Sequence, residues 1–565
     1  MIREKIIMCK FQKYLIAIFP FLYLILGFYF RQIFGDLSLR STDPEYIHFM
    51  SGMCVSTGQF SQANIDHPGS ALQLLLAVTF RLVYLFRPGT YPFFEDAMIN
   101  SDMYLAVGNL VISLMLATIL FWAGFKILRI TNNVVYALII QSSPLLFNIW
   151  YEIYGRIYPE LLFLIPILII QVQLLKEIYQ KDESSSITDV LIYAFAIALG
   201  MSLKMTFLPF VFLPLFTLKT LKRKMQFVAL SSLIFLLIAL PVTFQLERFW
   251  NWMKGIFIHS GGYQSGAKNI IDTKVFIENF KNLITSEKTF FVVFACLLVC
   301  FVALLVFKSK VKTDNRNKLI LINAGLLIAI LFVLFIVCKQ YAERYFIPAL
   351  LFFPFLMILI RESVLHYFNQ KKVRLALTTL LGVSTLFIIY RELPYAQIVS
   401  EGIEAQMQAR KQTQNFIATL PKDAYTIIVT QDYGCPYHEY SIMYSFCVAG
   451  GRWPGHNEKL DKIYPYRYFY FTWDNTIKYW GQEFDPKVIA CSGKPIFLYL
   501  EQNKDELYDR TIKKLLENHP EFSAQKEVLF ENHKNGESVL RLSLSLNVNQ
   551  VVMEDIQNKT VNEKK

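Results

Sequence analysis

Residues 319–338 read LILINAGLLIAILFVLFIVC, an apolar run of 20 residues without a charged side chain. About 17–25 mostly apolar residues are enough for a helix to cross the hydrocarbon core of a bilayer. Charged residues mark both ends of the run, with KSKVKTDNRNK at 308–318 before it and Lys339 after it. Together with ten similar runs it predicts an all-α polytopic membrane body of about eleven spans. The ten other runs are 14–33, 103–125, 134–151, 160–175, 188–203, 205–219, 225–246, 289–307, 345–361 and 375–391.

The overall composition agrees with a membrane protein. Hydrophobic residues make up 54% of the 565 residues and charged residues only 18%, whereas a soluble chain of this length would carry far more surface charge. The 49 Phe and 31 Tyr suit membrane–water boundaries, where aromatic side chains gather. The net charge of +12 is spread in short runs between apolar segments, which is typical of topology signals and argues against nucleic acid as a partner.

The positions of Lys and Arg predict how the chain is oriented. Cytoplasmic loops of membrane proteins are enriched in these residues. Segment 70–86, which carries Arg81, is the uncertain one. If it does not cross the membrane, every cluster of Lys and Arg falls on the same side of the membrane. We therefore expect 70–86 to lie in or dip into the outer face. The prediction is a multi-pass inner-membrane protein with a cytoplasmic N-terminus, a membrane domain at 1–391 that includes a first outer loop at 34–102, and an extracytoplasmic (periplasmic) domain at 392–565.

The C-terminal part has the pattern of a small α+β domain. Alternating stretches at 425–430 and 466–472 predict strands, and helical periodicity appears at 505–518. The last dozen residues are predicted to be disordered. Cys435 and Cys447 would face an oxidising compartment and form the predicted disulfide, with buried free thiols as the alternative.

The first outer loop holds the residues most suited to chemistry. Asp43 and Glu45 follow the first span by about ten residues, and Thr42 can cap a helix over about 44–57. The helix dipole favours ionised carboxylates at that end, so either could act as a general base toward an acceptor hydroxyl. The alternative is that both are simply acids of a helix start.

Several motifs resemble the membrane-embedded GT-C glycosyltransferases, especially the lipid A aminoarabinose transferases and the protein O-mannosyltransferases. In the first outer loop these families have an acidic motif, then a Tyr, a Gly turn and a His-Pro-Pro-Leu-type element. This chain has Asp43, Tyr46, Gly58 and His67-Pro68-Gly69-Ser70 in that order. It departs from the family at two positions. Pro44 stands where a second acidic residue is usual, so Glu45 is displaced by one residue. Gly69 stands where the second Pro is usual.

Three further motifs carry the resemblance along residues 14–360. They are Tyr154-Gly155-Arg156-Ile-Tyr158-Pro159-Glu160 in the second outer loop, Gly200-Met201-Ser-Leu-Lys204 between two short spans, and KQYAERYFIP at 339–348 before a late span. The predicted spans place five cationic side chains at outer membrane boundaries, namely Arg156, Lys204, His259, Lys339 and Arg344.

These cations have two interpretations. They could bind the phosphate of a leaving polyprenyl phosphate, on which negative charge develops, or they could snorkel to lipid headgroups. His67 could be a structural hydrogen-bonding residue before Pro68, an acid or a phosphate ligand. Glu160 is predicted to form an ion pair with Arg156, the alternative being a divalent metal ion held with Asp43.

The resemblance implies an inverting glycosyltransferase that uses a polyprenyl-phosphate sugar donor in the bilayer, on the outer face of the inner membrane. Asp43 would be the general base, assisted by Glu45 or Glu160, while Lys204, Arg156, Lys339 and Arg344 would hold phosphate. The acceptor could be a lipid, a glycan or a protein. Two other classes stay open, a lipid-linked glycan flippase or transporter and a non-enzymatic envelope assembly protein. A transporter would place charges near the midplane of broken, repeated helices, and no such repeat is visible.

Overall fold

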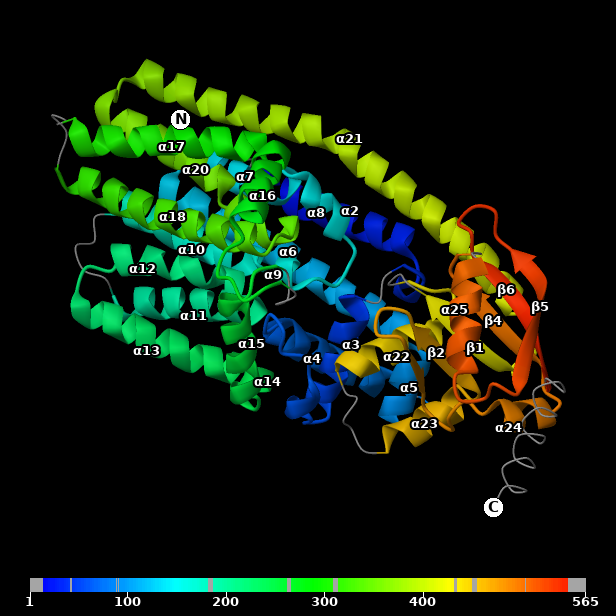
Figure 1. The fold of residues 1–565 in the computed structure, drawn as a ribbon. Coiled ribbons are helices and arrows are strands. Elements are labelled where there is room, and N and C mark those ends of the chain that lie inside the picture. Colours follow the sequence, from blue (N-terminus) through cyan, green and yellow to red (C-terminus); the bar gives the residue numbers. More distant parts are fainter. Residues whose placement is uncertain are drawn as a thin grey trace. The chain divides into compact units, whose positions relative to one another are not determined.

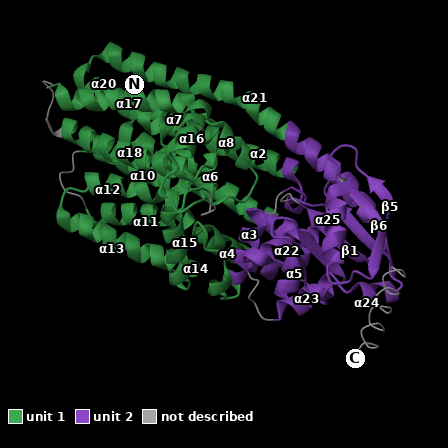
Figure 2. Ribbon diagram, in the orientation of Figure 1, with its two compact units in different colours: residues 1–32, 55–79, 106–400 green, residues 33–54, 80–105, 401–565 purple. Residues whose placement is uncertain are grey.

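The computed structural model is mostly helical, with one small sheet near the C-terminus (Figure 1). It describes residues 14–40, 43–87, 89, 91–180, 186–261, 266–307, 313–430, 434–449, 455–502 and 505–546. These residues divide into two compact units, unit 1 (1–32, 55–79 and 106–400) and unit 2 (33–54, 80–105 and 401–565) (Figure 2). Residues 41–42, and with them the predicted cap Thr42, lie outside the described residues, as do the last dozen residues.

The apolar helices run in one general direction within unit 1, and neighbours such as α10 and α11 or α12 and α18 pack against each other (Figure 1). The helices of the body are α2 (Ile18–Phe34), α4 (Ser70–Phe86), α6 (Ser101–Thr131), α7 (Val134–Gln141), α8 (Asn148–Ile153), α9 (Pro159–Leu162), α10 (Leu164–Tyr179), α11 (Ile187–Leu203), α12 (Phe212–Thr217), α13 (Leu221–Ile238), α14 (Leu240–Thr243), α15 (Leu246–Ile258), α16 (Thr273–Ser286), α17 (Lys288–Val306), α18 (Thr313–Lys339), α19 (Ile347–Leu350), α20 (Phe353–Tyr367) and α21 (Lys371–Ile417). Short 3-10 helices lie at Leu37–Leu39, Phe60–Gln62, Ser143–Leu145, Met205–Val211 (η4) and Glu343–Phe346 (η6).

Among the described residues, six helical stretches are long and apolar enough to cross a membrane. They are Ser101–Thr131, Pro159–Tyr179, Lys288–Val306, Asn315–Lys339, Glu343–Tyr367 and Lys371–Ile417. Five of them contain a predicted span, and Lys288–Val306 covers all but the last residue of the span 289–307. Shorter apolar helices occur at Ile18–Phe34, Ser70–Phe86, Ile187–Leu203 and Met205–Thr217. The chain is thus a multi-pass membrane protein, while the number of crossings and their orientation stay predictions.

Two predicted spans differ from the structure for local reasons. The run 134–151 is interrupted, because α7 ends at Gln141 and a 3-10 turn through Pro144 precedes α8. Proline lacks the N–H that would continue a helix. The last span was expected to end at residue 391, but α21 continues to Ile417. Residues 392–417 are rich in Glu, Gln and Ala, which are favourable in helices, so the helix persists after the apolar run has ended.

The two predicted short spans do meet at Lys204. Helix α11 ends at Leu203, Lys204 has an extended backbone (φ −163°, ψ 140°), and η4 follows at once. Gly200 makes close packing possible here, since a Cβ at this position would come within 2.1 Å of the Phe207 ring. A side chain at residue 200 would therefore push η4 away from α11.

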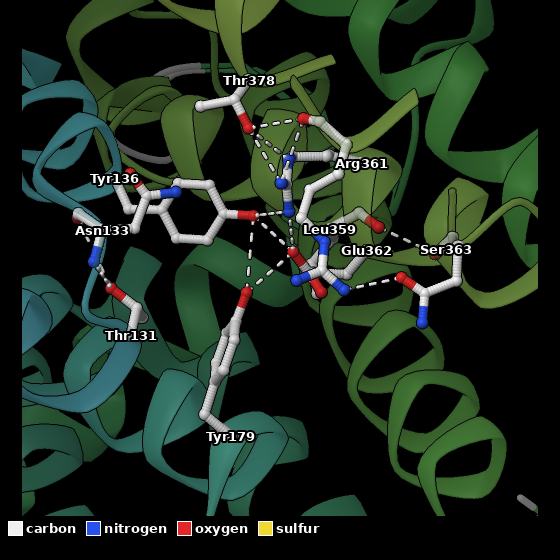
Figure 3. Close-up of polar contacts among 11 residues, drawn as sticks. Thr131, Asn133, Tyr136, Tyr179, Leu359, Arg361, Glu362, Ser363 and Thr378 are labelled. Atoms are coloured by element: carbon white, nitrogen blue, oxygen red, sulfur yellow. Dashed lines mark hydrogen bonds and ion pairs between the residues drawn. The ribbon is translucent and has the colours of Figure 1, made fainter. Parts of the chain in front are cut away.

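A buried polar cluster ties four helices of unit 1 together (Figure 3). Arg361 of α20 donates to the Glu362 carboxylate at 2.6 Å and to the Thr378 hydroxyl of α21 at 2.8 Å. Tyr179 of α10 donates to Glu362 at 2.8 Å, and Tyr136 of α7 donates to the same carboxylate. Buried polar groups are costly unless they are paired, so this cluster favours one arrangement of α7, α10, α20 and α21.

The C-terminal part is the expected small α+β fold. Its strands are β1 (Tyr425–Thr430), β2 (Arg467–Phe471), β3 (Thr476–Tyr479), β4 (Ile496–Leu500), β5 (Phe522–Glu531) and β6 (Ser538–Leu546), in the sheet order β3-β2-β1-β4-β6-β5. Strand β1 pairs in parallel with β2 and β4, and the other pairs are antiparallel. The helices of this part are α22 (His438–Val448), α23 (His456–Ile463), α24 (Pro486–Cys491) and α25 (Asp505–Leu515).

Unit 2 also includes two segments of the first loop, with helices α3 (Glu45–Ser56) and α5 (Phe93–Ile99). The backbone N–H of Cys435 donates to the carbonyl of Ser38 at 3.2 Å, which joins the loop to the C-terminal part. The sequence predicted a domain boundary between residues 391 and 392, at the end of the last span. The two compact units are defined by contacts within the chain and do not mark the edge of a membrane, so this boundary stays a prediction. Cys435 is buried, Cys447 is exposed and both are free thiols, so the predicted disulfide is not formed in this structure.

Candidate active site

The predicted site residues are distributed over both units. Asp43 and Glu45 belong to unit 2, and unit 1 contains the other six, which are His67, Arg156, Glu160, Lys204, Lys339 and Arg344. Within unit 1, the structure brings most of these six into one buried group.

Glu160 is the centre of this group. It is the second residue of α9, after Pro159, and its side chain is 1% exposed. The turn before it needs glycine, because Gly155 has a φ of +72° and a Cβ there would come within 2.5 Å of the Arg31 backbone nitrogen. The motif at 154–160 therefore directs a carboxylate into the protein interior.

Two cations from other elements compensate this carboxylate. The Lys204 ammonium donates to Glu160 Oε1 at 2.6 Å, and Arg344 Nε lies 3.7 Å from the same oxygen. The Lys204 side chain is 5% exposed and the Arg344 side chain 36%. Glu160 was predicted to pair with Arg156, and the structure gives it at least these two other partners. Because Lys204 is buried against a carboxylate, it does not snorkel to the membrane surface.

Aromatic rings surround the cations. The Lys204 ammonium lies 3.9 Å from the centre of the Tyr345 ring. The guanidinium groups of Arg156 and Arg344 lie 4.5 and 5.7 Å from the centre of the Tyr158 ring. Such contacts are favourable for cations that have lost part of their hydration. Tyr158 and Tyr345 occur in the motifs at 154–160 and 339–348, but sequence reasoning gave neither a role.

His67 closes one side of the group. Its Nε2 lies 3.2 Å from the Tyr345 hydroxyl, and its ring packs edge-on against Trp252 at 5.0 Å between centres. Burial lowers the pKa of His67 well below its usual range, and the charges of Lys204 and Arg344 lower it further. The imidazole is therefore neutral at physiological pH, so His67 is suited to hydrogen bonding and adds no charge.

The turn after His67 is joined to the Lys204 segment. Residue 67 has a left-handed backbone (φ +59°), Gly69 has a φ of +61°, and the Gly69 N–H donates to the Leu203 carbonyl at 3.1 Å. This hydrogen bond fixes the loop next to the residue that precedes Lys204. Ser70 then begins α4.

The contacts that the structure gives for Lys339 are with residues outside this group. Its ammonium donates to the Phe257 carbonyl at 2.8 Å, at the end of α18. His259 Nδ1 lies 3.1 Å from the Gly266 carbonyl oxygen. The phosphate role of Lys339 stays a prediction.

The group combines three cationic side chains with one carboxylate. Arg156, Lys204 and Arg344 contribute positive charges, Glu160 contributes a negative charge, and His67 is neutral. Arg156 and Lys204 are 9% and 4% exposed, so water screens them little. We refer to Arg156, Glu160, Lys204, Arg344 and the rings of Tyr158 and Tyr345 as the cation cluster. Guanidinium and ammonium groups gathered in this way suit an anion with several acceptor oxygens.

Unit 2 contains the two predicted carboxylates. Glu45 begins α3 and is fully buried, whereas Asp43 is partly exposed. The predicted helix over 44–57 corresponds closely to α3. Tyr46, the next residue, forms a 3.0 Å hydrogen bond with Ser101, and the Ser101 hydroxyl lies 2.5 Å from His438 Nε2. This Tyr–Ser–His chain was not predicted, because Ser101 and His438 are 337 residues apart in sequence.

A metal site does not follow from these residues. In the parts of the chain that the structure describes, no group of three or more His, Cys, Asp or Glu side chains could hold a metal ion. Glu160 is instead engaged with cationic side chains.

Comparisons with known proteins give similarity at the level of structure. No protein-family model matches the sequence, and no curated protein sequence matches it. The chain is similar to the solved structure of ArnT from Cupriavidus metallidurans bound to undecaprenyl phosphate, with a TM-score of 0.48, 11% identity and coverage of 93% of this chain and 97% of that chain. It is similar to apo ArnT from the same organism with a TM-score of 0.49, 12% identity and the same coverage. ArnT is a lipid A aminoarabinose transferase of the GT-C superfamily, one of the kinds of protein that the sequence motifs resemble.

Proposed function

We propose that this chain is a GT-C-type glycosyltransferase. It transfers a sugar from a polyprenyl-phosphate donor to a lipid, glycan or protein acceptor on the outer face of the inner membrane. The observation that carries the proposal is the cation cluster, in which buried Arg156 and Lys204 and partly exposed Arg344 gather with one buried carboxylate within a multi-pass membrane body.

The cation cluster suits the leaving group of this reaction. When the glycosidic bond breaks, negative charge develops on the bridging oxygen of the polyprenyl phosphate, and fixed cations stabilise that charge without reorganising. Arg156 and Arg344 offer planar guanidinium groups for phosphate oxygens, and Lys204 offers a compact charge.

Glu160 acts as a positioning residue in this proposal. Its carboxylate holds the Lys204 ammonium at 2.6 Å and lies 3.7 Å from Arg344, which limits the positions these side chains adopt before a donor binds. Preorganised charges are worth more to a reaction than mobile ones. The lipid part of the donor would lie among the apolar helices, which explains why a membrane enzyme is needed.

Asp43 is proposed as the general base and belongs to unit 2. Asp43 is partly exposed, while full burial of Glu45 favours a structural role for that residue. Asp43 takes the proton from the acceptor hydroxyl as its oxygen attacks the anomeric carbon. The bond to the phosphate oxygen breaks in the same displacement, so the configuration inverts and polyprenyl phosphate leaves.

Binding to a matched pair of lipids tests the donor role. Decaprenyl phosphate and decaprenol have the same chain and differ in the phosphate, and their affinities are measured for the purified protein in nanodiscs. We expect wild type to prefer the phosphate by about tenfold or more, because a charge-assisted hydrogen bond contributes about 1.5–3 kcal/mol.

The variant Arg344→Gln should lose much of this preference. Lys254→Gln, which removes the same charge from an exposed position of α15, should keep it. Equal affinity of wild type for the two lipids would remove the polyprenyl-phosphate donor from the proposal.

A further inference from the structure

A second cavity in unit 1 lies away from the cation cluster. It has a volume of about 640 Å³ and lies between α6, α10 and α11. Its lining residues, which we call the lipid groove, are Trp122, Lys126, Arg129, Ile130, Ile169, Val172, Gln173, Lys176, Gln180, Thr188, Leu191, Ile192 and Phe195. None of these residues takes part in the proposed sugar transfer.

Polar and apolar residues separate along the groove. On α6 and α10, the charged lining residues Arg129 and Lys176 lie toward the C-terminal ends, although Ile130 also lines this part of the groove. Trp122 and Ile169 come about two turns earlier. Helix α11 follows α10 and contributes polar Thr188 near its start and apolar residues further on. At about 1.5 Å per residue, the groove changes from polar to apolar over roughly 10 Å.

The apolar half of the groove is open to the membrane. Leu191 and Phe195 are 44% and 43% exposed, and they lie four residues apart on α11, which places them on one face. In a bilayer this face meets acyl chains. The adjoining indole of Trp122 has the amphipathic character of side chains at the level of lipid headgroups.

The polar half carries exposed positive charge. Lys176 is paired with Asp189, whose carboxylate lies 2.7 Å from the ammonium. Lys126 and Arg129 line the groove and are exposed. They are three residues apart on α6, so both charges project from the same side of the helix. The groove therefore offers two exposed cations beside an apolar surface.

We propose that the lipid groove binds one phospholipid with an anionic headgroup, in the leaflet at the C-terminal end of α6. Lys126 and Arg129 contact the phosphate and headgroup, and the acyl chain follows Leu191 and Phe195. Charge complementarity selects an anionic over a zwitterionic headgroup, since basic pockets between membrane helices favour anionic lipids. This site is separate from the donor site and does not depend on the proposed transferase activity.

Lipid binding to the full-length protein in detergent, measured by native mass spectrometry, tests the site. The probes are dioleoyl phosphatidylglycerol and dioleoyl phosphatidylcholine, which share their acyl chains. Wild type should bind the anionic lipid more tightly. The variant Lys126→Gln/Arg129→Gln should weaken phosphatidylglycerol binding by about tenfold or more and leave phosphatidylcholine binding unchanged.

A matched variant separates a specific site from net charge. Lys371→Gln/Lys372→Gln removes two exposed charges from the start of α21, outside the groove, and should bind phosphatidylglycerol like wild type. Equal weakening in both double variants would overturn the proposal, because the two cations would then act only as general topology signals.

A third variant distinguishes a lipid from a free anion. Leu191→Gln should weaken phosphatidylglycerol binding, because it places an amide against the acyl chain. If soluble glycerol 3-phosphate binds wild type as tightly as the lipid does, the groove is a site for free anions and the proposal is wrong.

Discussion

Replacement of Lys204 by Met separates the structural role of the ion pair from its proposed role in phosphate binding. Met has nearly the same apolar stem but no charge, so Glu160 would remain buried with Arg344 Nε at 3.7 Å as its nearest remaining partner in the group. Breaking a buried pair by removing one partner costs about 3–5 kcal/mol. Because Arg344 offers partial compensation, we expect Lys204→Met to lower the free energy of unfolding by about 3 kcal/mol.

The double variant Glu160→Gln/Lys204→Met removes the stranded charge as well. Replacing both members of a buried pair is often neutral, so its free energy of unfolding should lie within about 1.5 kcal/mol of wild type. Both variants should bind decaprenyl phosphate about tenfold more weakly or worse, because each lacks the ammonium. Lys254→Met, which changes the same residue type at an exposed position of α15 outside the cation cluster, is the control for both measurements.

The assay is equilibrium unfolding in mixed micelles, followed by tryptophan fluorescence, alongside decaprenyl phosphate binding in nanodiscs. If Lys204→Met is as stable as wild type, the ion pair does not compensate a buried charge and the reasoning from the 2.6 Å contact fails. If the double variant is stable yet binds decaprenyl phosphate like wild type, Lys204 has only a structural role.

Two more substitutions test other parts of the molecule. Asp43→Asn keeps the shape of the side chain but cannot accept the proton. The rate of sugar transfer in membranes should therefore fall by a factor of about 10²–10⁴, while decaprenyl phosphate binding stays normal. Near wild-type turnover would exclude Asp43 as the base. Burial, together with the nearby carboxylates of Glu343 and Glu392, raises the pKa of Glu287 to about 8. The folded protein therefore holds a proton that the unfolded chain releases, so the contribution of Glu287 to stability decreases as the pH rises from about 4.5 to about 8. Glu287→Gln should reduce this decrease in thermal unfolding temperature, and an unchanged pH profile would contradict the raised pKa.

The sequence predicted the elements whose signal is local. Apolar runs located the six long helices, and the alternation at 425–430 located β1 with its full length. The exceptions arose where a second local factor acted. Pro144 interrupts an apolar run that is long enough to span, and the helix formers after residue 391 extend α21 without any further apolar signal. Hydropathy alone reports neither effect.

The site was predictable as a set of residues, but its pairing was not. Short motifs drew attention to Glu160, Lys204 and Arg344 one at a time, because each is a charge beside an apolar run. Glu160 and Lys204 are 44 residues apart, and His67 and Tyr345 are 278 residues apart. Which charge meets which depends on how α9, α11 and η6 pack, and no single sequence expresses that packing. The predicted Arg156 partner was the nearest cation in sequence, which is a weak guide to the nearest cation in space.

Glu160 has a second task in the proposed function. Its carboxylate holds the Lys204 ammonium at 2.6 Å and lies 3.7 Å from Arg344 Nε. Without this acid the two cations would repel one another and lose hydration without compensation from Glu160. Glu160→Gln should therefore destabilise the protein. Because the cations remain in this variant, it should still prefer decaprenyl phosphate over decaprenol.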